Sequence, residues 1–114
     1  MPIADFIDTA VSAGVPLACD LSATDDPEAH GRRTKALLAE REEMRSIEGG
    51  LAFRFPATTA VAQRVLEFVE IERRCCPFLT FEIIFEPEGR ALWLALGGDE
   101  RVEAFVRSEF GGGA

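Results

Sequence analysis

The chain has 114 residues, of which 47% are apolar, and these values fit one domain whose core needs no disulfide bonds. The formal net charge of −8 argues against non-specific binding to nucleic acids or to anionic membrane surfaces. No apolar run approaches the roughly 20 residues of a membrane span, and the N-terminus lacks the basic region of a signal peptide. We therefore expect a cytoplasmic protein with no nucleic-acid partner and no membrane partner.

The N-terminal part of the chain predicts a loose arm followed by a short strand. Apolar residues recur at helical spacing in residues 1–15, which indicates a helix or a partly ordered arm. Residues 16–21 then predict a short strand that contains Cys19. Residues 22–28, which follow that strand, contain the start of a helix.

A long helix is predicted over residues 27–46. Asp26 is a suitable N-cap, and Pro27 fits the first helical position. The apolar stripe of this helix is thin and consists of Ala29, Leu37, Leu38 and Met44. One side of the helix should therefore pack and the other should face water, with His30 at the surface.

The second half of the chain alternates clearly between strands and helices. Gly49 and Gly50 mark a turn before a half-buried strand over residues 51–55. A helix then runs from Thr58 or Thr59 to Cys75. Two strands over residues 81–86 and 91–96 form a hairpin around a turn at residues 87–90, and Asp99 caps a last helix.

Together these elements predict an α+β domain over residues 16–110, followed by a flexible tail over residues 111–114. Its architecture should be one mixed or antiparallel sheet of about four strands with helices on one face. A purely parallel sheet is less suitable, because it usually needs both faces covered. Trp93 is expected in the core of this domain.

The adjacent thiols of Cys75 and Cys76 are the most informative feature of the sequence. Pro77 disfavours helical geometry at Cys76, so both thiols should lie where the helix ends, at the edge of its buried face. Thiolates favour soft ions, and Cys19 could join if its strand passes this helix end. We predict a metal site formed by Cys75, Cys76 and Cys19, with Hg(II), Cu(I) or Zn(II) as candidate ions and no certain cofactor. Three thiolates suit a trigonal soft ion better than structural zinc, which takes four ligands.

A thiol redox enzyme or sensor is the first alternative. Arg73 and Arg74 could lower a thiol pKa, but the helix C-terminus opposes a thiolate, and no CxxC motif is present. A disulfide from Cys19 to Cys75 or Cys76 is also possible if the Cα atoms come within about 4.4–6.8 Å. The cysteines could also be inert, because buried cysteine often acts as a small hydrophobe.

A non-catalytic homodimeric interaction module is the second alternative. Both sides of the predicted hairpin are apolar, so something should cover a second face, which contains Ile84, Leu92, Leu94 and Leu96. Glu72 is expected to pair with solvent or an arginine. No P-loop, HExxH or GxSxG motif is present, and we expect a binding protein rather than an enzyme.

Two segments resemble a bacterial family of small Cys-Cys-Pro-Phe domain proteins: residues 17–21, with sequence LACDL, and residues 72–78, with sequence ERRCCPF. Its members look like short stand-alone proteins or tails of metal-responsive regulators, and some are similar to proteins encoded beside mercury- or arsenic-resistance functions. The resemblance extends over about residues 17–107. It implies a thiol site for soft metals or metalloids at Cys75 and Cys76, with Cys19 joining, but it implies no established reaction. The expected function is therefore sequestration or handover of a soft metal ion or metalloid.

Overall fold

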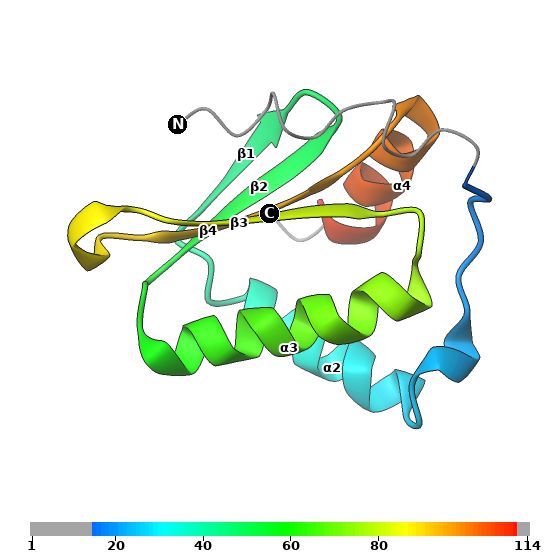
Figure 1. Ribbon diagram of the computed structural model, residues 1–114, viewed down its shortest axis with the longest axis horizontal. Helices are drawn as coiled ribbons and strands as arrows, with labels where there is room; N and C mark the ends of the chain where they lie inside the picture. Colours follow the sequence, from blue (N-terminus) through cyan, green and yellow to red (C-terminus); the bar gives the residue numbers. More distant parts are fainter. Residues whose placement is uncertain (1–14, 112–114) are drawn as a thin grey trace.

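The computed structural model describes residues 15–111 and shows an α+β domain. Its four-stranded sheet has the order β1-β2-β4-β3, and every neighbouring pair is antiparallel. The strands are β1 (Glu43–Ile47), β2 (Gly50–Phe55), β3 (Thr80–Phe85) and β4 (Leu92–Gly97). The helices are α2 (Pro27–Leu38), α3 (Thr59–Cys75) and α4 (Glu100–Phe110), with 3-10 turns η2 (Leu21–Ala23) and η3 (Pro87–Gly89). This arrangement confirms the predicted fold class (Figure 1). The sheet was predicted to be mixed or antiparallel, and it is antiparallel.

The main core lies between the sheet and the helices. Strands β2 and β4 turn alternate side chains toward the helices, as the spacing of residues 51–55 predicted. These core residues are Leu51, Phe53, Phe55, Leu92, Leu94 and Leu96 from the sheet, with Val65, Phe68, Val102, Val106 and Phe110 from the helices. Helices α3 and α4 therefore share one hydrophobic layer against the same face of the sheet.

A second, smaller cluster lies on the opposite face of the sheet. Ala52, Trp93 and Ala95 are buried there, and the Arg45 guanidinium lies 4.7 Å from the centre of the Trp93 ring. Trp93 is therefore buried, as predicted. Ile84 packs against this cluster.

The expectation of one apolar face shared by Ile84 and the three leucines of β4 was wrong. Leu92, Leu94 and Leu96 point to the helices, while Ile84 is the register partner of Trp93 on the other face. Successive side chains of a strand point to opposite faces, and the pairing assigns Ile84 to the face of Trp93. The homodimer stays a prediction.

The predicted helix over residues 27–46 is too long. Helix α2 ends at Leu38, where Arg41 Nη1 donates a hydrogen bond of 2.8 Å to the Leu38 carbonyl. The chain then enters strand β1, and Met44 pairs with Phe53 in register. Met44 therefore reaches the core from a strand rather than from the helical stripe.

Residues 16–21 do not form the predicted strand. The Asp20 side chain instead accepts a hydrogen bond from the Ser22 amide and starts the turn η2. The Asp20 amide donates to the carbonyl of Cys75 at 2.6 Å, rather than to a neighbouring strand. Strand β1 supplies the fourth strand of the sheet in place of this segment.

Helices α3 and α4 begin where the sequence predicts. The Thr58 hydroxyl accepts a hydrogen bond from the Val61 amide, and the Asp99 carboxylate accepts one from the Val102 amide. Within residues 15–111, no helix has both the length and the apolar character needed to cross a membrane. The predicted arm over residues 1–15 and the tail over residues 111–114 lie outside the described residues, except for Val15 and Gly111.

Candidate functional site

The C-terminal end of α3 fixes the two adjacent cysteines. Cys75 is the last residue of the helix, and Cys76 is its C-cap, with its amide donating to the Glu72 carbonyl at 2.7 Å. Pro77 follows, which agrees with the predicted helix end. Only 5% of Cys75 and 4% of Cys76 is exposed, so this helix end buries both thiols.

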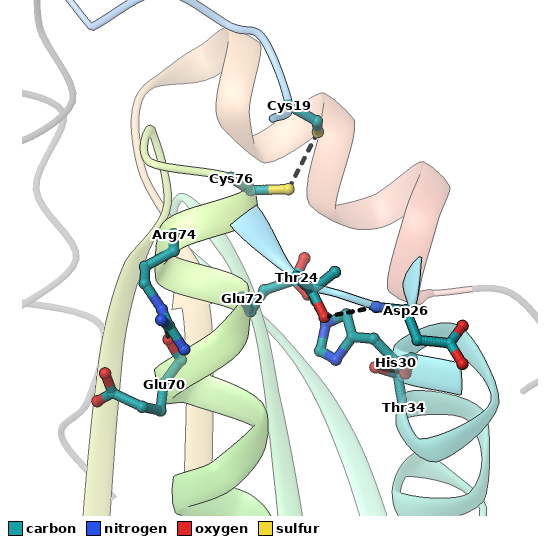
Figure 2. A network of polar contacts seen from close by, with 9 residues as sticks. All are labelled: Cys19, Thr24, Asp26, His30, Thr34, Glu70, Glu72, Arg74 and Cys76. Carbon is teal, nitrogen blue, oxygen red and sulfur yellow. Dashed lines mark hydrogen bonds and ion pairs between the residues drawn. The ribbon is translucent and has the colours of Figure 1, made fainter. Parts of the chain in front are cut away.

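Cys19 approaches this helix end on an irregular segment of chain. The hydrogen bond from the Asp20 amide to the Cys75 carbonyl holds the segment against the last turn of α3. As a result, Cys19 Sγ lies 3.0 Å from Cys76 Sγ (Figure 2). Cys19 is exposed, so the contact joins one accessible sulfur to one buried sulfur.

The structure joins Cys19 to Cys76 but does not gather all three thiols around one point. Within residues 15–111, no group of three or more His, Cys, Asp or Glu side chains is arranged to hold a metal ion. Cys75 is nevertheless close enough to Cys19 for a charge on Cys19 to affect its ionisation. The two sulfurs in contact form the centre of the site, and Cys75 flanks it.

The surroundings keep the buried thiols protonated. Burial raises the pKa of the Cys76 thiol far above its ordinary value, and the hydrogen bond with Cys19 and the nearby Glu72 carboxylate add to this effect. Burial also raises the pKa of Cys75, followed by the charges of Glu72, Asp20 and Cys19.

Neither buried cysteine has a lowered thiol pKa, although Arg73 and Arg74 could have lowered one. The charge of Arg74 does lower the pKa of Cys75, but burial and the nearby negative groups outweigh it. Arg73 instead forms an exposed ion pair with Glu70 at 2.6 Å, and Arg74 Nε donates to the Glu70 carbonyl. Both arginine side chains are therefore directed along the exposed side of the helix.

A buried His30–Glu72 pair lies beside the thiols. His30 Nε2 is 2.6 Å from Glu72 Oε2, and the two residues are only 8% and 7% exposed. His30 comes from α2 and Glu72 from α3, so the pair bridges the two helices (Figure 2). The expectations of a surface His30 and of a Glu72 paired with solvent or arginine were both wrong.

The sequence contains a signal for this pair that spacing arguments can detect. Glu72 follows Phe68 by four positions and continues the buried row of Val61 and Val65. A carboxylate within such a row needs a buried partner. The His30 ring provides that partner and also stacks on Phe68, with ring centres 6.0 Å apart.

An open pocket of about 1600 Å³ adjoins the thiols. Cys19, Cys75, Cys76, His30 and Glu72 line it together. Its apolar lining includes Leu21, Leu38, Met44, Phe105 and Phe110. The rest of the lining is largely polar or charged, so the apolar side chains form only part of the wall.

Comparisons of the chain with protein-family models, with curated proteins and with solved structures found no match. The family resemblance therefore stays an expectation, and the functional argument depends on the geometry of the thiol site.

Proposed function

We propose that this protein binds a soft metal ion or a metalloid through Cys19 and Cys76 and hands it to another thiol carrier in the cytoplasm. The observation that carries the proposal is the 3.0 Å contact between two sulfur atoms that are 57 residues apart in the chain. Thiolate ligands select thiophilic ions. Two ligands that already meet lose little further conformational freedom on binding.

The charges around the site favour an incoming cation over a free thiolate. Burial and the nearby carboxylate of Glu72 raise the pKa of Cys76, so the free thiolate is disfavoured. A bound cation neutralises thiolate charge and is attracted by the carboxylates of Glu72 and Asp20, whose charges both act on Cys75. The same surroundings oppose a nucleophilic thiol enzyme, which needs a stabilised thiolate.

Handover is supported by the unequal exposure of the two sulfurs. Cys19 is exposed, so a thiol of another molecule can reach a ligand held there from the solvent side. Cys76 is buried and holds the ligand from the protein side. Exchange of one sulfur at a time then passes the ligand on without releasing it into water.

The proposal is tested by titrating the reduced protein with Hg(II) and with arsenite while following the ultraviolet absorbance of the sulfur bonds that form. Cys19→Ala and Cys76→Ala should each weaken binding at least about a hundredfold, which corresponds to about 2.7 kcal/mol. Cys75→Ala is the matched control, because Cys75 is as buried as Cys76 and adjacent to it, and it should weaken binding less than about tenfold. Unchanged binding in both Cys19→Ala and Cys76→Ala would remove the proposal.

The same sulfur contact favours a second function, a reversible disulfide. A disulfide bond is about 2.0 Å long, so the two sulfurs would approach each other by roughly 1 Å. With a low-molecular-weight disulfide as oxidant, the two cysteines lose two protons and two electrons, and the oxidant is reduced to two thiols. The oxidised protein would have no free thiol pair for a metal.

Incubation with oxidised glutathione followed by peptide mapping tests the second function. The expected product links Cys19 to Cys76 and leaves Cys75 free. A product that links Cys19 to Cys75 instead, or only mixed disulfides with glutathione, would contradict it.

A further inference from the structure

The separation of the two sulfurs determines how far they must move to bind ions of different geometry. With bonds of about 2.3 Å to the central atom, two sulfurs lie roughly 3.3 Å apart at a right angle, 3.8 Å apart at a tetrahedral angle and 4.6 Å apart in a linear complex. The two thiols form a hydrogen bond, with Cys19 Sγ and Cys76 Sγ 3.0 Å apart, so a centre with a right angle requires the smallest movement of the sulfurs. Trivalent arsenic and antimony bind sulfur at such angles because a lone pair occupies one side of the atom.

The number of thiols that meet leaves one bond of such a centre to another group. A trivalent pyramidal centre forms three bonds, and Cys19 and Cys76 supply two. Within residues 15–111, no third His, Cys, Asp or Glu completes a three-ligand group with them. The third substituent therefore comes with the ligand.

Exchange at such a centre also fits the burial of Cys76. An organic arsenous acid, R–As(OH)₂, reacts with two thiols to give R–As(S)₂ and two molecules of water. Two As–O bonds break and two As–S bonds form, and each thiol proton leaves with a hydroxide, so nothing is oxidised or reduced. The product has no net charge on the sulfur of Cys76, which suits a buried position.

An organic substituent would find apolar side chains in the pocket that the thiols line. Phe105 and Phe110 meet edge to face, with ring centres 6.3 Å apart, and both line this pocket. Leu21 follows Cys19 by two positions, lines the same pocket and is 67% exposed. Burial of this exposed leucine against an apolar group would contribute roughly 25 cal/mol per Å² of apolar area.

From these observations we propose that the thiol pair takes a trivalent arsenical bearing one organic group, and that Leu21 and Phe105 contact this group in the pocket. This inference rests on the proposed capture of soft metals and metalloids, and it names the class of ligand. The discriminating feature is the organic group, because inorganic arsenite has none to place in the pocket.

The test compares phenylarsine oxide with arsenite by competition against dithiothreitol, which cancels the intrinsic preference of any dithiol for either compound. Relative to dithiothreitol, the protein should prefer phenylarsine oxide over arsenite at least tenfold. Leu21→Ser and Phe105→Leu should each reduce the affinity for phenylarsine oxide about three- to tenfold and leave the affinity for arsenite unchanged. Leu66→Ser is the matched control, because Leu66 is also exposed, at 53%, and does not line the pocket.

Equal preference for the two arsenicals relative to dithiothreitol would overturn this inference and leave thiol capture standing. Leu21→Ser and Phe105→Leu variants that bind both compounds as the unaltered protein does would also overturn it. Failure of both compounds to bind would overturn the inference, and failure of Hg(II) as well would overturn the proposed function too. Leu21 is exposed, so the Leu21→Ser result does not depend on whether Phe105→Leu folds.

Discussion

At the scale of single residues, the three cysteines differ in exposure although two of them are neighbours. Cys19 is exposed, whereas Cys75 and Cys76 are buried at the end of α3. Thiol reactivity depends on the thiolate fraction and on access. Access separates Cys19 from the other two, whose pKa values burial raises.

Iodoacetamide should label Cys19 at least about tenfold faster than Cys75 or Cys76 at pH 8. The raised pKa values of the buried thiols should keep their labelling rates increasing with pH beyond 9.0, the ordinary thiol value. Time-resolved peptide mapping with fragmentation between the adjacent cysteines measures the three rates. In denaturant all three should react alike, and equal rates in the folded protein would contradict the prediction.

The His30–Glu72 pair should couple the stabilities of α2 and α3. A double-mutant cycle with His30→Gln and Glu72→Gln should give an interaction free energy of about 0.5–3 kcal/mol, because either single change leaves a buried polar group without its partner. Urea unfolding measures the four free energies. The exposed Glu70–Arg73 pair is the control and should couple more weakly, because solvent screens it. An interaction for His30–Glu72 no larger than that of the control would disprove the structural role.

Sequence reasoning identified the thiol-bearing residues but not the groups around them. Cys75 and Cys76 could be assigned to a helix end because Pro77 follows them. The approach of Cys19 could not be derived from spacing, because it depends on one backbone hydrogen bond between irregular chain and the end of α3. The role of Glu72 was available from its position in the buried row, but the identity of its partner was not.

At the scale of the elements, the prediction of strands succeeded where the apolar pattern of the sequence was strong and failed where that pattern was weak. Strand β2 alternates large apolar side chains with Ala52 and Arg54, strand β4 is a continuous apolar run, and both were predicted. Strand β1 has the sequence EMRSI, in which only Met44 and Ile47 are apolar. Met44 also fits the helical stripe seven positions after Leu37, so local pattern favoured a helix where pairing with β2 produces a strand.

Replacing Gly50 or Gly31 by alanine should change the stability of the protein in opposite directions. A Cβ atom at Gly50 would lie 1.9 Å from the Leu96 carbonyl oxygen, so Gly50→Ala should destabilise the β2–β4 pairing by roughly 1–3 kcal/mol or more. Gly31 lies inside α2, and beyond its chain neighbours and the backbone of its own helix no atom lies within 4 Å of such a Cβ, so Gly31→Ala should stabilise the protein by about 0.5–1 kcal/mol. Thermal unfolding of both variants measures the two effects. A Gly50→Ala protein as stable as the Gly31→Ala protein would contradict the close approach of β2 to β4.

At the scale of the whole molecule, the thiol contact joins two distant parts of the chain. Cys19 and Cys76 are separated by 57 positions, and the intervening chain contains α2, β1, β2 and α3. The contact therefore closes a loop around half of the sheet and two of the helices. A covalent link at this point would restrict the unfolded chain strongly.

Oxidation of Cys19 and Cys76 to a disulfide should stabilise the protein by about 4 kcal/mol according to the loop-closure relation. Equilibrium unfolding in denaturant, with and without reductant, measures the difference. A Cys75→Ala background prevents exchange between neighbouring thiols and leaves the pair intact. A Cys19→Ala, Cys75→Ala protein should show no effect of reductant. Equal or lower stability of the oxidised form would mean that the bond strains the helix end.

The last turn of α3 supports both halves of the thiol site. Its Cys75 carbonyl accepts the Asp20 amide, and its Glu72 carbonyl accepts the Cys76 amide. Fraying of this single turn would loosen the two sulfurs simultaneously while the sheet remained folded. Under the proposed function, retention and discharge of cargo would be coupled to local melting of one helix terminus, so a docking carrier would need only to unwind a few residues.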